Sequence, residues 1–226
     1  MNNCYRLNLP SNPLNPKYKD EVLTLDQSPA NWIKSPPWKI FHGEDEINRL
    51  ILPEILQTFR ELDLYPSHIV LFFLTTPISF EKGYLHRDIA LSDGVWTDVP
   101  FGINFELNPT TKTTISWWDT SNLQEIYDDD DYSRNCLPYQ NGRRYHANRL
   151  RSIPKYLNAT LIETHSLEGN THPILFRTNV AHSVSTTTSE GIRFNLSIRF
   201  DLKKHKTFEE GLEKLKPIII GSSNTN

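Results

Sequence analysis

Apolar residues recur with a helical period in one stretch of the chain, residues 44–62. The apolar positions Ile47, Leu50, Ile51, Ile55 and Phe59 are three or four residues apart, so they fall on one face of a helix. Acidic residues at positions 44–46 suit the positive end of the helix dipole, and Pro53 is expected to kink the helix. We therefore expect a helix over residues 44–62 that covers one side of a sheet.

From residue 67 onward, short apolar or alternating runs are separated by Gly, Pro, Asn or Ser/Thr clusters. The run HIVLFFLTTP predicts a buried strand. Further strands are predicted at residues 83–89, 101–108, 113–119, 159–163, 173–178 and 191–202, and a short amphipathic helix is predicted to end at Pro217. So many strands after a single helix indicate a mainly β fold with flanking helices, either a barrel or a sandwich, and disfavour a doubly wound α/β fold.

The remaining segments have no sustained period. Residues 1–43 contain turns such as LPSNPLNPK and SPPWK, which predict an N-terminal arm anchored by Trp32, Ile33 and Trp38. Residues 120–157 are too long for a hairpin and predict a lid or excursion. The expected organisation is one domain: the arm 1–43, a flanking helix 44–66, a β core 67–202 that contains the excursion 120–157, and a C-terminal helix and tail 203–226.

Composition excludes several classes of protein. The 226 residues include 37% hydrophobic and 23% charged residues, as in an ordinary soluble globular domain. A net charge of -3 provides no basic field for nucleic acid or an acidic membrane, and the longest apolar run is too short to span a bilayer. Cys4 and Cys136 show no C-x-x-C spacing, and the first residues lack the pattern of a secretion signal. A cytoplasmic protein is therefore expected.

Candidate metal ligands lie on two predicted strands. His86 and Asp88, in YLHRDIA, are two residues apart, so their side chains project from the same face of a strand. His182, in NVAHSV, lies on another predicted strand edge. Two histidines and one carboxylate leave three positions open on a metal, the arrangement typical of non-haem Fe(II) oxygenases. An H-x-D pattern alone often arises by chance. The metal-site interpretation is supported further because His182 and Arg193 follow it in this order on predicted strands.

The strand that includes Arg193 carries polar residues on one face and apolar residues on the other. The polar positions are Arg193, Asn195, Ser197 and Arg199. If that face looks into the mouth of a barrel, its arginines offer forked donors suited to a carboxylate. We expect His182 and Arg193 to meet across a hairpin.

These motifs together resemble the 2-oxoglutarate and Fe(II)-dependent dioxygenase superfamily, particularly its prolyl-hydroxylase-like and phytanoyl-hydroxylase-like branches. The resemblance covers about residues 68–202, through H-R-D, FGINFELN, TTISWW, PILFRTNVAHSV and GIRFNLSIRF. It implies a double-stranded β-helix, a jelly-roll or cupin-like core with the metal at its open end.

The resemblance also implies roles for individual residues. His86, Asp88 and His182 would hold Fe(II), and Arg193 would bind the distal carboxylate of 2-oxoglutarate, the cosubstrate. Further residues that could bind the cosubstrate are Asn104 and Thr114, while Ser197 and Arg199 offer a competing site for its carboxylate. The implied reaction consumes O2, releases succinate and CO2, and hydroxylates a substrate that is a small molecule or a peptidyl side chain.

Two other functions fit the same residues. A non-catalytic β-barrel module for binding or structure would keep the fold without functional iron. A cupin-like metal enzyme would keep the metal but not use 2-oxoglutarate, and cosubstrate binding at Arg193 would separate the two metal enzymes. The basic residues at 143–151 could grip a phosphate, but a solvated lid is the simpler interpretation, as it is for the acidic run 128–131.

Overall fold

The computed structural model describes residues 2–23, 38–78, 86–92, 95–108, 112–121, 145–149, 159–167 and 171–221. The protein is mainly β with flanking helices, as the sequence pattern predicts. The helices are α1 (Lys19–Leu23), α2 (Glu44–Leu50), α3 (Pro53–Glu61) and α5 (Phe208–Leu215), with 3-10 turns η1 (Pro16–Tyr18) and η2 (Lys216–Ile218). The strands are β1 (Cys4–Arg6), β2 (Trp38–His42), β3 (Pro66–Ile78), β4 (His86–Ser92), β5 (Val95–Asp98), β6 (Phe101–Glu106), β7 (Thr113–Asp119), β8 (Tyr145–Arg149), β9 (Thr160–Ser166), β10 (Ile174–Arg177) and β11 (His182–Phe200).

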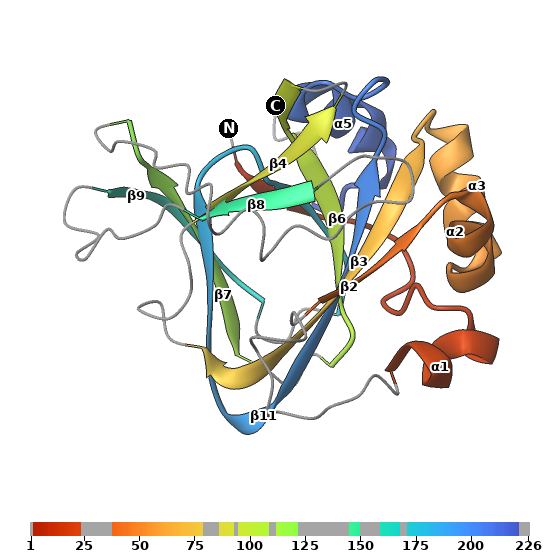
Figure 1. Cartoon of the computed structure of the whole chain (residues 1–226), viewed down its shortest axis with the longest axis horizontal. Coiled ribbons are helices and arrows are strands. Elements are labelled where there is room, and N and C mark those ends of the chain that lie inside the picture. The colour runs from red at the N-terminus through yellow and green to blue at the C-terminus, as the bar shows by residue number, and fades with distance from the viewer. Residues whose placement is uncertain are drawn as a thin grey trace.

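The long strand β11 organises the sheet because its two halves pair with different neighbours. Its C-terminal half lies within the order β1-β10-β6-β11-β3-β2, which we call the helix-backed arm. Its N-terminal half pairs with β7 and, at His182, with β4; together with β5, β8 and β9 these strands form the second arm. Figure 1 shows β11 descending on one side, turning at the bottom and rising on the other. All of these pairings are antiparallel.

The hairpin expected between His182 and Arg193 is not formed. Both residues lie on the continuous strand β11, whose register against β3 shifts between Thr186 and Gly191. The chain therefore changes direction by bending one strand, and the two residues end up on different arms of the sheet.

The main core lies between the helix-backed arm and the helices, which Figure 1 shows on the outer side of these strands. Alternate residues of β11 point into this core: Leu196, Ile198 and Phe200 are buried there, and the Phe200 ring meets the edge of Phe59 from α3 at 5.5 Å between centroids. All five apolar positions of the predicted helix face are buried in the same core.

The single kinked helix predicted over residues 44–62 is two helices. The chain is extended at Ile51, with φ -96° and ψ 144°, and a new helix, α3, begins at Pro53. Proline favours the first position of a helix because its fixed φ fits and its missing N–H has no partner there in any case. The proline therefore starts a helix instead of kinking one.

The predicted C-terminal helix is α5, and its start is fixed by a capping box. The Thr207 hydroxyl accepts a hydrogen bond from the Glu210 N–H, and the Glu210 carboxylate accepts one from the Thr207 N–H. Gly211 faces Phe101 of β6, so the helix lies close against the sheet.

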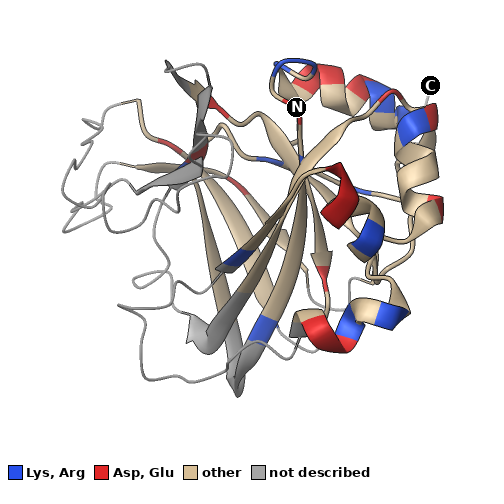
Figure 2. Ribbon diagram, turned by 45° about the vertical axis from the view of Figure 1, so that its right-hand side comes forward, with Lys and Arg blue, Asp and Glu red and all other residues tan. Residues whose placement is uncertain are grey.

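Charged residues are spaced along the helices in Figure 2, whereas the described strands carry few. Among the described residues, no helix is long and apolar enough to cross a membrane. The segment 1–43 supplies β1, α1 and β2, while Trp32 and Ile33 lie outside the described residues. Most of the segment 120–157, including the acidic run, also lies outside them, and its residues 145–149 form β8, which pairs with β4.

Candidate functional site

The face of the helix-backed arm that turns away from the helices is polar along β6 and the C-terminal half of β11, whereas Phe176 and Ile174 of β10 make it apolar farther along the sheet. On β11 it carries Arg193, Asn195, Ser197 and Arg199, which alternate with the core residues. The register extends this face to neighbouring strands, because Asn104 lies opposite Ser197, Glu106 opposite Asn195, and His68 opposite Arg199. We call these seven residues the polar face. Buried polar groups require partners, so this face is a candidate binding site.

Each arginine of the polar face forms an ion pair with a carboxylate from another strand. The Nη2 of Arg193 lies 2.7 Å from Oε2 of Glu106, and their side chains are 4% and 7% exposed. The Nη2 of Arg199 lies 2.6 Å from Oδ2 of Asp88, and their side chains are 7% and 16% exposed. Asp88 belongs to β4, so the second pair joins the two arms and the polar face lies between them.

Five polar atoms of this face form no hydrogen bond within the described part of the chain. They are Arg193 Nε, Arg199 Nη1, Asn104 Oδ1, Asn195 Oδ1 and Ser197 Oγ. An unsatisfied buried polar atom costs about 1–3 kcal/mol, so such a row indicates a polar ligand or ordered water. The arginine N–H groups donate to a carboxylate, and an asparagine amide can present either its oxygen or its nitrogen.

The H-x-D motif and His182 meet through strand pairing. His182 lies directly opposite His86 in the antiparallel register, and residues in such positions have Cβ atoms about 4.5–5.5 Å apart. Asp88 lies two residues along β4, on the same side of the pleat. The ring of His182 meets the edge of Phe176 at 4.8 Å between centroids, and Phe176 lies opposite Gly102 on the polar side of the helix-backed arm. His182 and Asp88 therefore face the space between the arms.

One hydrogen bond sets the tautomer of His182. Its Nδ1 lies 2.8 Å from the carbonyl oxygen of Val180, which can only accept, so Nδ1 carries the proton. A neutral ring in this tautomer presents its Nε2 lone pair, the form that binds a metal. The His86 side chain lies outside the described part of the structure, and the described side chains include no group of three His, Cys, Asp or Glu residues gathered for a metal ion.

A neutral imidazole, His68, lies opposite Arg199, and a second one, His42, lies on the next strand. His42 is opposite His68 in the register, with 5.6 Å between ring centroids, and Nδ1 of His68 lies 2.8 Å from the Ser67 hydroxyl. Burial, followed by the positive charge of Arg199 and by His42, lowers the pKa of His68 well below its usual value. Burial lowers the pKa of His42 to about 4. Because both rings are neutral at pH 7, the charge of Arg199 is balanced by Asp88.

The remaining predicted residues are not all brought to this face. Thr114 lies opposite Ser185, and strand alternation puts it on the other side of β7 from Trp117, which shares the face of His182. Arg193 and Arg199 are six residues apart, about 20 Å along an extended strand, so they serve different parts of the site.

Glu106 and His68 belong to the polar face but were not expected as site residues, and Asn195 was expected there only as a polar position of its strand. Glu106 had a usable signal, because it and Asn104 occupy alternate positions of the otherwise apolar strand FGINFE.

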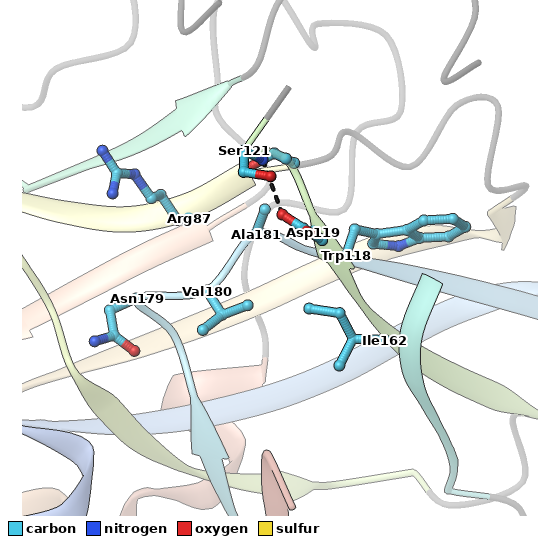
Figure 3. A pocket seen from close by; sticks show the side chains of 9 residues that line it. Arg87, Trp118, Asp119, Ser121, Ile162, Asn179, Val180 and Ala181 are labelled. Carbon is cyan, nitrogen blue, oxygen red and sulfur yellow. Dashed lines mark hydrogen bonds between the residues drawn. The ribbon is translucent and has the colours of Figure 1, made fainter. Parts of the chain in front are cut away.

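A hollow of about 220 Å³ is lined by residues of β4, of β7 and of the segment just before β11. Figure 3 shows Arg87, Trp118 and Asn179 around it, with the hydrogen bond of 2.9 Å from the Ser121 N–H to Asp119. Arg87 lies between His86 and Asp88 in the chain, so strand alternation turns it away from their face. The hollow is therefore behind the H-x-D motif and separate from the polar face.

The chain was compared with known proteins. No protein-family model matches it, and no curated protein matches it. Among solved structures it is similar to HygX from Streptomyces hygroscopicus with nickel and 2-oxoglutarate bound, at 9% identity and a TM-score of 0.33, over 81% of this chain and 73% of that chain. A likeness this distant assigns neither a fold nor a function.

Proposed function

We propose that this protein is a 2-oxoglutarate- and Fe(II)-dependent oxygenase with a double-stranded β-helix core, and that it hydroxylates its substrate. The observation that carries the proposal is the register of β11, which pairs His182 with His86 and continues into the polar face. One strand thus links the candidate metal ligands to a buried row of groups suited to a carboxylate. The two antiparallel arms joined by β11 support the proposed core.

The donor chemistry fits Fe(II). His86, Asp88 and His182 would supply two imidazoles and one carboxylate, which leave three coordination positions open. The hydrogen bond from His182 to Val180 supports this role because it directs Nε2 toward a ligand. A carboxylate can accept a hydrogen bond through one oxygen and bind a cation through the other, so the contact of Asp88 with Arg199 is compatible with coordination. Bound iron would supply the redox chemistry that couples decarboxylation of 2-oxoglutarate to hydroxylation.

The polar face would bind the cosubstrate. Arg199 pairs with Asp88, itself a proposed metal ligand, so it would lie at the metal end of the row. This supports Arg193, six residues along β11, as the residue that takes the distal carboxylate. The partnerless atoms of Asn104, Asn195 and Ser197 lie between the two arginines along β6 and β11, where they can hydrogen-bond the cosubstrate. Burial of the face keeps bulk water away from these contacts and strengthens them.

An anaerobic titration tests the proposal without knowledge of the substrate. Purified apo-protein receives Fe(II) and then 2-oxoglutarate, and the visible charge-transfer band is followed. We expect a band that requires both components, that is absent in His86→Ala and His182→Ala, and that needs more 2-oxoglutarate in Arg193→Ala. The matched control is His172→Ala, which removes an exposed histidine and should leave the band unchanged.

The other outcomes separate the alternatives. Wild-type protein that binds no iron and gives no band would move the assignment to a non-catalytic β-barrel module. Iron binding that depends on His86 but does not respond to 2-oxoglutarate would favour a cupin-like metal enzyme that does not use the keto acid.

A further inference from the structure

Glu106 forms an ion pair with Arg193, the residue that would bind the cosubstrate under the proposed function. Its carboxylate accepts a hydrogen bond of 2.7 Å from Nη2 of Arg193, and both side chains are almost fully buried. Two hydrogen bonds join the backbone next to this pair. The Leu107 N–H donates to the Phe194 carbonyl at 3.0 Å, and the Phe194 N–H donates to the Asn108 side chain at 2.8 Å. The end of β6 therefore holds Glu106 against Arg193.

This pair removes the positive charge that would attract a second carboxylate. A guanidinium next to a buried carboxylate is electrically neutral as a unit, so an incoming dicarboxylate meets no net positive site. It also meets the negative charge of Glu106, because two carboxylates at one guanidinium repel each other. The affinity for the cosubstrate must therefore depend on whether Glu106 retains its hold on Arg193.

The contact between the two residues is incomplete, which allows a competitor to displace it. An arginine binds a carboxylate best through two parallel N–H groups. Here Nη2 of Arg193 donates to Glu106, whereas its Nε has no partner among the described residues. A cosubstrate carboxylate can approach through Nε and then take over Nη2.

We propose that Glu106 competes with the distal carboxylate of the cosubstrate for Arg193 and thereby sets the affinity and selectivity of the site for dicarboxylate keto acids. This inference rests on the proposed function. The role of Glu106 differs from those of the metal ligands and of Arg193. Glu106 weakens cosubstrate binding, and it affects only ligands that carry a distal carboxylate.

The test compares two keto acids on wild-type protein and the Glu106→Gln variant, both loaded anaerobically with Fe(II). Glutamine keeps the shape of the side chain but loses its charge. We expect Glu106→Gln to lower the dissociation constant for 2-oxoglutarate about tenfold, equivalent to about 1.4 kcal/mol. For 2-oxobutyrate, which lacks the distal carboxylate, the constant should change by about twofold or less. A general structural effect would alter both ligands together.

A matched control changes the same charge elsewhere. Glu209→Gln removes the carboxylate from the Arg177–Glu209 pair, which spans 3.3 Å and in which Glu209 is 48% exposed. It should leave both dissociation constants unchanged. A second variant, Glu106→Asp, keeps the charge but shortens the side chain, so it should weaken the hold on Arg193 and tighten 2-oxoglutarate binding by a smaller factor. This variant keeps the test decisive if the glutamine variant does not fold.

The outcomes distinguish the two levels of inference. Wild-type protein that binds 2-oxoglutarate while neither Glu106 variant binds it more tightly would overturn the role of Glu106 and leave the proposed function standing. Tighter binding of both keto acids in Glu106→Gln would also overturn it. If neither wild-type nor variant protein binds 2-oxoglutarate, the proposed function fails and the role of Glu106 fails with it.

Discussion

Arg199 reaches from β11 to Asp88 on β4 and so links the two arms through a single contact of 2.6 Å. Removing one partner of a buried ion pair leaves the other charge uncompensated, at a cost of about 3–5 kcal/mol. Glutamine can still donate one hydrogen bond. We therefore expect Arg199→Gln to lower the free energy of unfolding of the metal-free protein by about 2–3 kcal/mol, measured by urea denaturation.

A divalent cation at Asp88 would replace the lost positive charge, so on the proposed function Fe(II) should stabilise Arg199→Gln more than wild-type protein. Arg60→Gln, on the exposed side of α3, changes the net charge equally and should alter stability by about 0.5 kcal/mol or less. An Arg199→Gln variant as stable as wild-type protein would show that the pair does not link the arms.

Gly102 allows the guanidinium of Arg199 to lie across β6. A Cβ at this position would be 2.9 Å from Nη1 of Arg199 and 3.1 Å from its Cδ. Gly102→Ala should therefore displace the arginine and lower the free energy of unfolding by about 1–2 kcal/mol. The measurement is a double-mutant cycle: the loss should be smaller in the Arg199→Gln background, because the displaced atoms are then absent. Equal losses in both backgrounds would contradict the contact.

At the scale of elements, α5 is held close to the sheet by a glycine. A Cβ at Gly211 would lie 2.5 Å from Cε1 and Cζ of Phe101, whose buried ring is also 5.2 Å from that of Phe200. In an exposed helix, replacing glycine with alanine stabilises by about 1 kcal/mol. Here overpacking costs about 1–3 kcal/mol, so Gly211→Ala should destabilise the protein and lower its Tm. Glu213→Ala, at an exposed position of α5, is the control and should change Tm little; a higher Tm in Gly211→Ala would contradict the close approach.

Elements with a local signal could be predicted, and those shaped by distant contacts could not. The strand expected at residues 113–119 has the bounds of β7, because alternation is a property of neighbouring residues. The stretch STTTS before Gly191 resembles a turn by composition, yet its threonines also suit a strand. Ser185 and Thr186 pair with β7, and Thr186 also pairs with Ile78 of β3, so β11 continues as one strand through the expected hairpin.

At the scale of the whole molecule, the sequence could select residue types for the site but not their partners. The polar positions of β11 follow from alternation alone. That Arg193 meets Glu106, 87 residues away in sequence, depends on the register of β6 against β11. The contact of Arg199 with Asp88 depends on how the arms face each other. Neither contact produces a periodic pattern in the sequence. The residue types of the candidate site could therefore be predicted, but not which residues contact one another.

Buried imidazoles make the whole fold sensitive to acid. Burial is the largest cause that lowers the pKa of His42, His68, His165 and His205, and the pKa of His42 falls to about 4. An unfolded chain protonates its histidines near pH 6.5, whereas the folded chain resists protonation until lower pH. Between these values the unfolded state binds more protons, so the free energy of unfolding should fall as the pH drops from about 6.5 toward 4, while these histidines add no pH dependence above about 7.5.

Urea denaturation across this pH range measures the slope for wild-type protein and for a variant with both His42→Gln and His68→Gln. The variant should show a shallower decline, because its glutamines do not titrate and the penalty of protonating the rings of His42 and His68 disappears. His172→Gln removes an exposed histidine and should retain the wild-type slope. The free energy of unfolding of the double variant could instead decline as steeply as that of wild-type protein. In that case burial does not keep the two imidazoles neutral, and their positive charge adds to that of Arg199 opposite Asp88.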